Sequence, residues 1–388
     1  MLIFKRRIAE QILKRIKNRG LIVILGPRQA GKTTLVKTLL KNLGHNDAYF
    51  NCEQSDVRRA FILGDTDALN NLINGRTLVA FDEAQTIPNI GKILKLFHDT
   101  YPEIKIIATG SSSFELANEI REPLTGRADE FMLYPLSLAE ISDTLTLTPE
   151  LFSDILRFGT YPAVVAVNTT EEKEAEIKRI ATNYLYKDVF TFEALRNPKN
   201  FEDLVTHLAT RVGSTINTSS LAKAIGVAPA TVENYIRLLE QAFVIKRIYS
   251  FARNYAKELK KAYKIYFLDN GVMNALTSIP EHDDNSALGK NFEALIYTEF
   301  LKNDTLHPLP PRTYFWRTST KLEIDFVRTH GYTIDAYEVK YGKPDATFTT
   351  FKKLYPEATT HIITPGNTLP HCTITQNNQW MDNICKME

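Results

Sequence analysis

The chain has 388 residues, enough for two or three domains at about 100–200 residues each. Hydrophobic residues make up 44% and charged residues 24%, which is ordinary for a globular protein and excludes disorder as its main state. The 47 lysines and arginines nearly balance the 45 aspartates and glutamates, and the formal net charge is +2. The chain is therefore not a polycation, and any nucleic-acid surface must be a local patch.

Cysteine usage and hydropathy indicate the cytoplasm. The three cysteines, Cys52, Cys372 and Cys385, have no spacing that suits a disulfide framework or a zinc site, as expected in a reducing compartment. No run approaches the roughly 18 apolar residues of a membrane span, and the basic start is not followed by the apolar stretch of a signal peptide. We expect a soluble cytoplasmic protein without a membrane partner.

The first 140 residues alternate between helical and strand-like patterns. Apolar residues at helical spacing predict a helix over residues 7–18, which Gly20 ends. Continuous apolar runs predict strands that are buried on both faces, at residues 21–25, 48–52, 77–81, 105–109 and 131–136. The helical patterns between these runs are typical of an α/β fold with a doubly wound parallel sheet.

Three further regions follow this domain, which we place at residues 1–140. Residues 141–200 are mostly helical and lid-like, residues 201–280 form a helical unit that ends in a strand, and residues 281–388 form a smaller α/β domain. In the last region we expect a helix over 292–301, strands over 314–317, 323–328 and 333–340, and a final helix and strand near 348–355 and 361–364.

A phosphate-binding loop lies between the first apolar strand and a predicted helix over 34–40. The sequence matches GxxxxGK[ST] without a mismatch, in the strand–loop–helix context that the motif requires. The glycines let the backbone wrap around phosphate oxygens, the helix directs N–H groups at them, and the lysine brings a cation to the β- and γ-phosphates of ATP. The predicted nucleotide-binding residues here are Gly26, Pro27, Arg28, Gln29, Ala30, Gly31, Lys32, Thr33 and Thr34.

Two acidic residues end the strand predicted over 77–81. Asp82 and the Thr33 hydroxyl are the predicted Mg²⁺ ligands, because ligands of open parallel sheets bind at the carboxyl ends of the strands. Glu83 is the predicted general base that polarises the attacking water. The next strand leads to Ser111, a predicted contact to the γ-phosphate or to the water; the serines there can equally cap the following helix.

These segments resemble the AAA+ superfamily and, more closely, a family of prokaryotic ATPases. Its chains carry a GPRQxGKTT loop, a DEAQ-like strand end, TGSSS, Leu-x-Gly-Arg and PLSxxE, found here at 26–34, 82–85, 109–113, 124–127 and 135–140. The resemblance continues through residues 158–162, where the family usually has two glycines and this chain has Gly159 and Thr160. It covers essentially the whole chain and implies an AAA+-type P-loop ATPase with a winged-helix domain and a C-terminal restriction-endonuclease-like domain of the PD-(D/E)xK type.

The resemblance also implies a role for Arg127. In AAA+ relatives an arginine at this position often reaches the γ-phosphate of a neighbouring subunit, so Arg127 is a candidate arginine finger and a homo-oligomer is expected. An ordinary surface salt bridge is the alternative.

The unit over 201–280 resembles a winged helix-turn-helix. A short helix over 219–227, a glycine turn, a longer helix over 228–239 and a strand follow one another. The exposed candidates for DNA contact are Pro229, Thr231, Asn234 and Arg237. A basic run with interleaved aromatics follows, which suits a phosphate backbone: Lys246, Arg247, Arg253, Lys257, Lys260, Lys261 and Lys264. Against this, winged helices also dock proteins, and Glu233 on the second helix would oppose phosphates.

The last domain carries an Asp…Glu-x-Lys pattern with a helical glutamate upstream, at Glu293, Asp325, Glu338 and Lys340. On a strand Glu338 and Lys340 share a face, and Asp325 approaches Glu338 if the two strands pair. Asp325 and Glu338 are then predicted ligands of Mg²⁺ or Mn²⁺ in a nuclease-like site, with Glu293 and Lys340 as further catalytic residues. Cross-strand salt bridging is the alternative.

The sequence thus predicts an enzyme that binds and hydrolyses ATP with Mg²⁺ and acts on nucleic acid, with DNA as the expected partner and a nuclease-like C-terminal domain. The alternative is a nucleotide-dependent regulatory or scaffold ATPase whose C-terminal domain does not cleave and binds a partner. A remodeller of protein substrates is a third reading.

Overall fold

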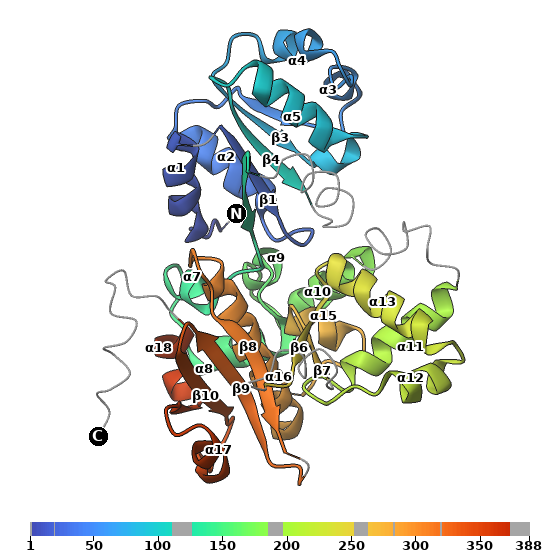
Figure 1. Cartoon of the computed structure of the whole chain (residues 1–388), viewed down its shortest axis with the longest axis vertical. Coiled ribbons are helices and arrows are strands. Elements are labelled where there is room, and N and C mark those ends of the chain that lie inside the picture. Colours follow the sequence, from blue (N-terminus) through green and yellow to red (C-terminus); the bar gives the residue numbers. More distant parts are fainter. Residues whose placement is uncertain are drawn as a thin grey trace.

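The parallel sheet near the N-terminus forms one end of the molecule, and the other elements gather below it (Figure 1). The structure is a computed structural model that describes residues 2–18, 20–110, 126–184, 197–251, 263–281, 284–318 and 320–372. The N-terminal helices are α1 (Ile8–Asn18), α2 (Lys32–Asn42), α3 (Ser55–Arg59), α4 (Thr66–Ile73) and α5 (Ile90–Thr100). The strands of this domain are β1 (Leu21–Leu25), β2 (Tyr49–Asn51), β3 (Leu78–Asp82), β4 (Lys105–Gly110) and β5 (Ala128–Met132).

The five strands form a parallel sheet in the order β2-β3-β4-β1-β5. Alternate residues of β1 enter two different cores, because Leu21 and Val23 pack on one face and Ile22 and Ile24 on the face that α1 and α2 cover. This explains why the strand is apolar throughout. Since β4 lies between β1 and β3, the carboxyl ends of all three strands are neighbours.

Four of the five predicted strands agree with the structure within a few residues, and the fifth is displaced. We predicted residues 131–136, but β5 is Ala128–Met132 and Leu136 lies in the connection after it. The apolar signal misled the prediction because Leu133 and Leu136 are buried without belonging to the strand. An edge strand with one covered face needs fewer apolar residues than a central one.

The middle of the chain is helical and then takes the order of a winged helix. The helices are α7 (Leu138–Ser142), α8 (Pro149–Phe158), α9 (Pro162–Val165), α10 (Thr170–Tyr184), α11 (Pro198–Ala209), α12 (Thr218–Ile225) and α13 (Pro229–Gln241). An antiparallel hairpin of β6 (Ile245–Tyr249) and β7 (Tyr263–Phe267) follows, and α15 (Asn270–Ala275) comes next. The strand β7 was not predicted, since the basic residues before it masked its apolar alternation.

The C-terminal domain pairs one long helix with a four-stranded sheet. Its elements are α16 (Asn285–Asp304), β8 (Arg312–Arg317), β9 (Glu323–His330), β10 (Thr333–Val339), α17 (Thr349–Leu354), β11 (Thr359–Ile363) and α18 (Thr368–Cys372). The strand order is β11-β10-β9-β8, in which β9 pairs antiparallel with β8 and β10, as the predicted approach of Asp325 to Glu338 requires.

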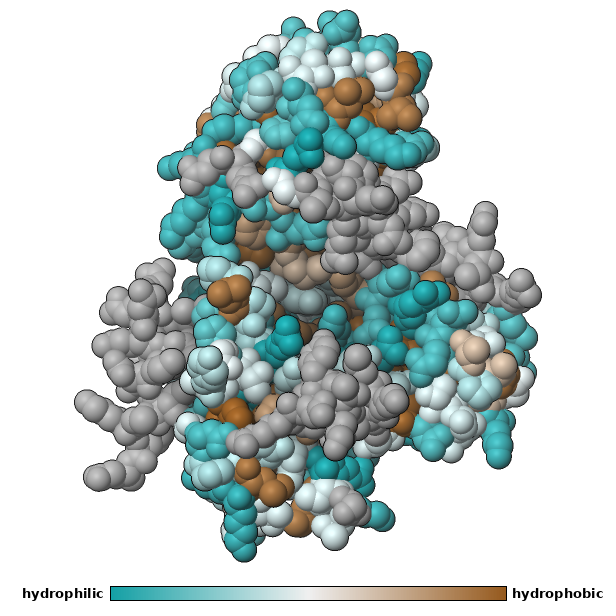
Figure 2. Space-filling view, in the orientation of Figure 1, coloured by the Kyte–Doolittle hydropathy of each residue, from teal (hydrophilic) through white to brown (hydrophobic). Residues whose placement is uncertain are grey.

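One hydrophobic core runs from the N-terminal sheet through the helical middle to the C-terminal sheet. Phe152 of α8 meets Phe292 of α16 with ring centroids 5.9 Å apart. The regions separated in the sequence prediction are thus joined by burial. The face in Figure 2 is mostly hydrophilic with scattered hydrophobic residues. Among the described helices, none has the length and apolar character needed to cross a bilayer.

Candidate functional site

The phosphate-binding loop connects β1 to α2 and depends on two glycines. Gly26 has φ 154°, and a Cβ there would lie 2.1 Å from the carbonyl oxygen of Leu133. Gly31 has φ 98° and stands before α2 without a side-chain cap, so the first N–H groups of the helix are directed into the loop. The predicted loop geometry is therefore present, with an anion-binding helix N-terminus behind it.

Lys32 lies at the centre of this loop. Its side chain is buried, with 4% exposure, and its ammonium donates to the carbonyl oxygens of Gly26 and Pro27 at 2.8 Å each. A lysine folded into the curve of the loop places a cation where the β- and γ-phosphates of a nucleotide would lie.

Three hydroxyl groups hold Asp82 at the end of β3. Thr33 donates to Asp82 Oδ2 at 2.6 Å, Tyr49 donates to the same oxygen at 2.7 Å, and Thr109 donates to Oδ1. Burial, and after it the hydrogen bond to Asp82, raises the pKa of the Tyr49 phenol, which therefore stays protonated as a donor. A carboxylate beside the loop threonine suits Mg²⁺, which is commonly held by one or two protein oxygens together with substrate phosphates.

Glu83 follows Asp82 in a left-handed conformation, with φ 54°. Its N–H donates to Thr109 Oγ1 at 3.1 Å, and Gln85 Nε2 donates to its carboxylate at 2.5 Å. Strain of this kind is retained where surrounding contacts over-determine the backbone, and here it points the carboxylate into the cavity beside the loop. Ser111, the predicted polar contact of the neighbouring strand, lies outside the described residues, and Thr109 supplies a hydroxyl from that strand.

A cavity of about 280 Å³ opens beside the phosphate loop. One wall carries Lys32, Thr33, Thr34 and Glu83; Leu2 lies at the rim, and the facing wall carries Pro162, Ala163 and Ala166 of α9 and the residues after it. The cavity therefore lies at the junction of the N-terminal domain and the helical middle, where α9 sits in Figure 1. From the same side, Arg179 of α10 donates to Gln29 Oε1 in the loop at 3.4 Å. Nothing in the sequence indicated that α9 and α10 would lie beside the phosphate loop.

Arg127 lies just before β5, at the end of the sheet where the parallel strands begin. The phosphate loop lies at the other end of the strands, and a strand of five residues is about 16 Å long. Arg127 forms an ion pair with Asp99 at 2.8 Å, and both side chains are about 40% exposed. The residue is thus remote from the nucleotide cavity of its own chain.

The winged-helix region uses several of its predicted basic residues internally. Arg247 pairs with Glu233 at 2.9 Å and with Glu240 at 2.6 Å, so Glu233 is turned toward the hairpin. Lys264 belongs to β7 of the hairpin, and its side chain is buried. Lys246, Asn234 and Arg237 are exposed. Arg253, Lys257, Lys260 and Lys261 lie outside the described residues.

The four predicted residues of the C-terminal site come together, and two further residues join them. Lys340 contacts Glu338 at 2.5 Å and Asp325 at 3.9 Å, and Asp325 accepts a hydrogen bond from the Val339 N–H at 2.8 Å. Lys264 of β7, whose side chain is 2% exposed, lies 2.5 Å from Glu323 and 3.7 Å from Glu293. We call Glu293, Glu323, Asp325, Glu338, Lys264 and Lys340 the carboxylate cluster.

Two lysines offset part of the negative charge of the four carboxylates in the carboxylate cluster. Ammonium groups contact its carboxylates from two sides, and Arg317 approaches Glu323 at 3.4 Å. Within the described part of the chain, no group of three or more His, Cys, Asp or Glu side chains has an arrangement that could hold a metal ion. In this arrangement Lys264 and Lys340 lie next to carboxylate oxygens, as in the salt bridging that the sequence left as the alternative.

Comparisons with known proteins divide the chain into three parts. A family described as an AAA domain matches residues 18–142, and two domains of unknown function, DUF8612 and DUF4143, match residues 149–283 and 288–379. The match over residues 18–142 and the five-stranded parallel sheet together make the N-terminal domain a P-loop ATPase domain of the AAA type.

Two relatives that match most of this chain are described as uncharacterized proteins. An uncharacterized protein of Mycobacterium tuberculosis is 27% identical over 330 residues, covering 84% of this chain and 71% of that protein. An uncharacterized protein of Haemophilus influenzae is 24% identical over 357 residues, covering 86% and 85%. Among solved structures, a Walker-type ATPase of Pyrococcus abyssi aligns with a TM-score of 0.47 and 17% identity over 71% of this chain and 96% of that chain.

Proposed function

We propose that this protein, whose N-terminal part is a P-loop ATPase domain of the AAA type, is an ATP-driven switch that hydrolyses ATP with Mg²⁺. One observation carries the proposal: the phosphate loop, Glu83 and α9 line the same cavity. A nucleotide bound there touches the N-terminal domain and the helical middle together, so its hydrolysis bears on how the two are placed.

The mechanism follows from the residues that line the cavity. The N–H groups at the start of α2 and the Lys32 ammonium would bind the phosphates, and Thr33 and Asp82 would hold a magnesium ion, which would supply positive charge next to the phosphates. Glu83 orients the attacking water and accepts its proton as general base. The apolar wall of α9 limits the access of bulk water to the reacting groups.

Nucleotide turnover by purified full-length protein tests this proposal. We expect Lys32→Ala to weaken ATP binding and Glu83→Gln to lower kcat at least about 100-fold while binding persists, because general-base catalysis contributes about 10²–10⁴-fold. Lys92→Ala, on an exposed position of α5, serves as the control and should leave turnover unchanged. Absence of ATP binding in the wild-type protein would contradict the proposal.

For the C-terminal domain we favour partner binding without cleavage over phosphodiester hydrolysis. The supporting observation is that Lys264 and Lys340 lie against carboxylate oxygens of the cluster, among them those of Glu338, which a nuclease would use for a metal ion. The restriction-endonuclease-like assignment rests on four residues of the cluster: Glu293, Asp325, Glu338 and Lys340. Their closeness in the structure is compatible both with a nuclease and with a domain that only binds a partner.

Incubation of circular and linear DNA with Mg²⁺ or Mn²⁺, with and without ATP, separates the two readings. No cleavage under any condition supports the partner-binding domain. Cleavage that Asp325→Ala and Lys340→Ala both abolish would show that the domain is a nuclease and that the cluster rearranges around a metal.

Nucleic-acid binding by the winged-helix region is a second candidate function. The observation that favours it is the outward face of α13, where Asn234 and Arg237 are exposed while the acidic Glu233 is paired with Arg247. This removes the like-charge objection that the sequence raised. Fluorescence anisotropy with labelled duplex DNA over a salt series tests it: we expect Arg237→Ala to weaken binding and to reduce the salt dependence, and Arg312→Ala on exposed β8 to do neither.

Arg127 remains a proposed arginine finger, acting on a neighbouring subunit. Because Arg127 lies far from the phosphate loop of its own chain, it would act on a nucleotide bound by a neighbouring subunit and not on its own. Analytical ultracentrifugation with ATP should then show an assembly, and Arg127→Ala should reduce turnover without reducing ATP affinity. A monomer with full turnover would contradict this role.

A further inference from the structure

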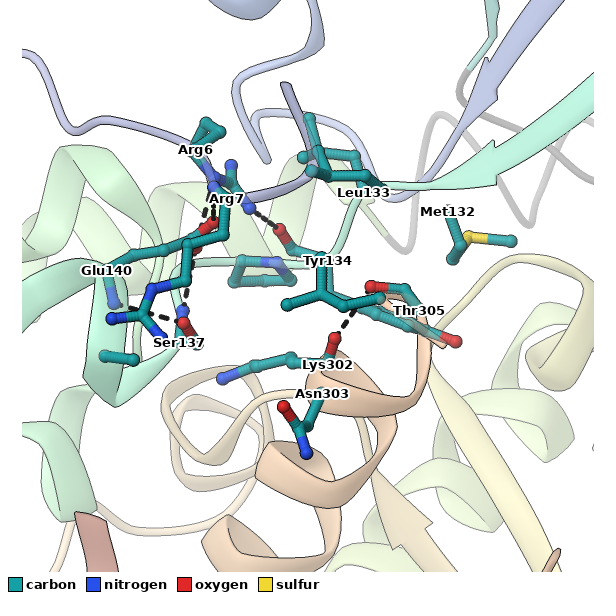
Figure 3. A pocket seen from close by; sticks show the side chains of 14 residues that line it. Arg6, Arg7, Met132, Leu133, Tyr134, Ser137, Glu140, Lys302, Asn303 and Thr305 are labelled. Carbon is teal, nitrogen blue, oxygen red and sulfur yellow. Dashed lines mark hydrogen bonds and ion pairs between the residues drawn. The ribbon is translucent and has the colours of Figure 1, made fainter. Parts of the chain in front are cut away.

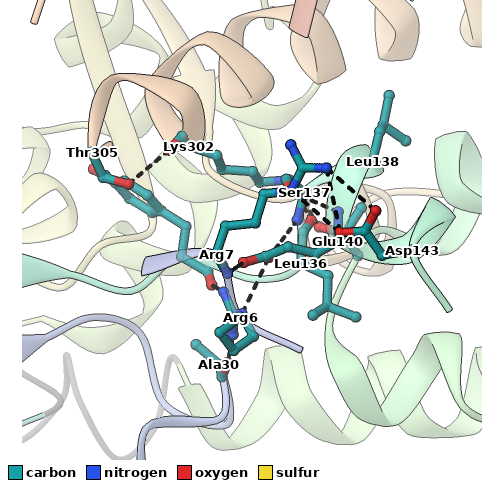
Figure 4. A network of polar contacts seen from close by, with 12 residues as sticks. Arg6, Arg7, Ala30, Leu136, Ser137, Leu138, Glu140, Asp143, Lys302 and Thr305 are labelled. Carbon is teal, nitrogen blue, oxygen red and sulfur yellow. Dashed lines mark hydrogen bonds and ion pairs between the residues drawn. The ribbon is translucent and has the colours of Figure 1, made fainter. Parts of the chain in front are cut away.

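Arg6, before α1, supports the phosphate loop from behind. Its side chain is 8% exposed, and its guanidinium donates to the carbonyl oxygens of Ala30 at 2.7 Å and of Tyr134 at 2.6 Å. Its Nε lies 3.1 Å from Glu140 Oε2. A single arginine thus joins the loop to the segment that follows β5, as Figure 4 shows.

Glu140 organises that segment, residues 134–140. It closes a capping box with Ser137 at the start of α7, and its other oxygen accepts the N–H of Arg7 at 2.8 Å. A buried carboxylate that pairs with Arg6 and accepts backbone hydrogen bonds is held in one position, because moving it would leave charged groups unpaired.

Helix α16 reaches the same segment from the opposite side. Glu299, with no exposed surface, accepts the Leu138 N–H at 2.9 Å and pairs with Lys302 at 2.7 Å. Lys302 in turn donates to the Leu136 carbonyl oxygen at 2.9 Å. The segment over 134–140 therefore lies between two buried ion pairs, one from the N-terminus and one from α16.

Thr160 links this arrangement to the other wall of the nucleotide cavity. Its hydroxyl accepts a hydrogen bond from Lys302 at 3.1 Å and donates to Asp269 at 3.2 Å, and its backbone carbonyl accepts the Leu136 N–H at 3.0 Å. Pro162, which faces the phosphate loop, follows two residues later. A glycine at position 160, as the resembling family usually has, would lack the hydroxyl and both of its contacts.

The space between these groups is too small for a ligand of its own. The pocket in Figure 3, which Arg6, Tyr134, Glu140 and Lys302 line, has a volume of about 30 Å³, close to that of one water molecule. The polar groups around this space form hydrogen bonds and ion pairs with one another.

We propose that Arg6 is a positioning residue of the phosphate loop and that Arg6, Glu140, Lys302 and Thr160 form a relay through which bound ATP is sensed by helix α16. Arg6 contacts the loop at Ala30, Lys302 contacts Thr160 just before α9, and residues 134–140 join the two. The same helix carries Glu293 in the carboxylate cluster, so the relay connects the nucleotide to the C-terminal domain. This inference rests on the proposed ATP binding at the loop.

The physical basis is the cost of parting buried charges. Removing one partner of a buried ion pair is strongly unfavourable, so the groups of the relay move together or not at all. When phosphates draw the loop and α9 toward one another, the displacement is passed to Lys302 and hence to the last turns of α16.

Two measurements on the full-length protein test the relay. In steady-state kinetics, Arg6→Gln should raise KM for ATP about tenfold with a much smaller change in kcat, and Arg6→Lys should restore part of the affinity. The matched control is Arg7→Gln, since the neighbouring Arg7 side chain pairs with the exposed Asp143 at 3.3 Å and should have no effect. Hydrogen exchange of the last turns of α16 with and without ATP reports on the relay directly.

We expect ATP to change exchange in α16 of the wild-type protein and of Arg7→Gln, and to leave it unchanged in Thr160→Val. Thr160→Val keeps the hydrogen bond from the Leu136 N–H to the backbone carbonyl of residue 160. Its test does not depend on a change in ATP affinity, so it remains informative if Arg6→Gln does not fold. Wild-type protein that hydrolyses ATP without any change in α16 would overturn the relay and leave the proposed function intact. Wild-type protein that does not bind ATP would contradict the proposed function itself.

Discussion

The nucleotide cavity and the carboxylate cluster both gather acidic side chains at the ends of buried strands, but they hold them with different donors. Asp82 is held by the hydroxyls of Thr33, Tyr49 and Thr109. Glu323 and Glu338 are held by the ammonium groups of Lys264 and Lys340.

This difference determines what each site can receive. Hydroxyls orient a carboxylate without cancelling its charge, which leaves Asp82 able to attract Mg²⁺. Lys264 and Lys340 offset two of the four carboxylate charges and lie next to oxygens that a metal ion would use.

The largest expected effect comes from removing the buried cation of the carboxylate cluster. Lys264→Met should lower the free energy of unfolding by about 3–5 kcal/mol, since Glu293 and Glu323 would lose their buried counter-charge. It should also make the protein's melting temperature rise with added Mn²⁺ more than that of the wild type, because the uncompensated carboxylates then attract a metal ion. Thermal denaturation with a Mn²⁺ titration measures both effects.

Lys246→Met, on the exposed part of the same hairpin, is the matched control for this substitution. It should change neither the stability nor the response to Mn²⁺. An equal Mn²⁺ response of Lys264→Met and the wild type would break the comparison, because it would mean that Lys264 does not decide the metal preference of the cluster.

A smaller effect is expected from pH. Burial, and after it the charge of Asp325, raises the pKa of Glu293 to about 7 from 4.5, against the opposing influence of Lys264 and Tyr266. Between about pH 4.5 and about pH 7, the Glu293 carboxyl is protonated in the folded protein and ionised in the unfolded chain. Its contribution to the free energy of unfolding is therefore fully present below about pH 4.5 and is lost as the pH rises through about 7.

Thermal denaturation from about pH 4 to about pH 8 measures this contribution, because this range includes both the ordinary pKa of 4.5 and the raised pKa of about 7. Glu293→Gln should flatten the decline in stability with rising pH, because an amide does not titrate. Glu103→Gln, at an exposed position of the N-terminal domain, should keep the wild-type slope. Parallel slopes for Glu293→Gln and the wild type would contradict the raised pKa.

The smallest expected effect sharpens the other side of the comparison. Tyr49→Phe removes one of the three hydroxyls on Asp82 and keeps the ring that packs beside Lys37. We expect the Mg²⁺ concentration for half-maximal ATPase activity to rise about 3–10-fold, which corresponds to the roughly 1 kcal/mol of a typical net hydrogen bond. Tyr101→Phe loses a similar bond to Asp67, at 2.9 Å on the surface, and is the control. Unchanged Mg²⁺ dependence in Tyr49→Phe would show that the phenol does not position Asp82.

Local sequence was enough for four of the five parallel strands, the phosphate loop and the placement of Asp82 and Glu83. Phosphate binding depends on the backbone of consecutive residues, and Gly26, Gly31 and Lys32 are the types that this backbone requires. Strand periodicity also placed Glu338 and Lys340 on one face, whereas the predicted approach of Asp325 depended on the pairing of the two strands, which the structure has.

Tertiary structure decided which charges meet. Tyr49, Arg6 and Lys264 lie in segments without a motif, and each contacts its carboxylate only because burial of a shared core brings distant segments together. Apolar burial has no direction of its own, so a local pattern cannot specify the partner of a buried charge. The sequence therefore predicted the strand that ends in Asp82 and the strand that holds Asp325. Only the folded molecule determined that hydroxyl groups hold Asp82, whereas lysine ammonium groups pair with the carboxylates of the cluster.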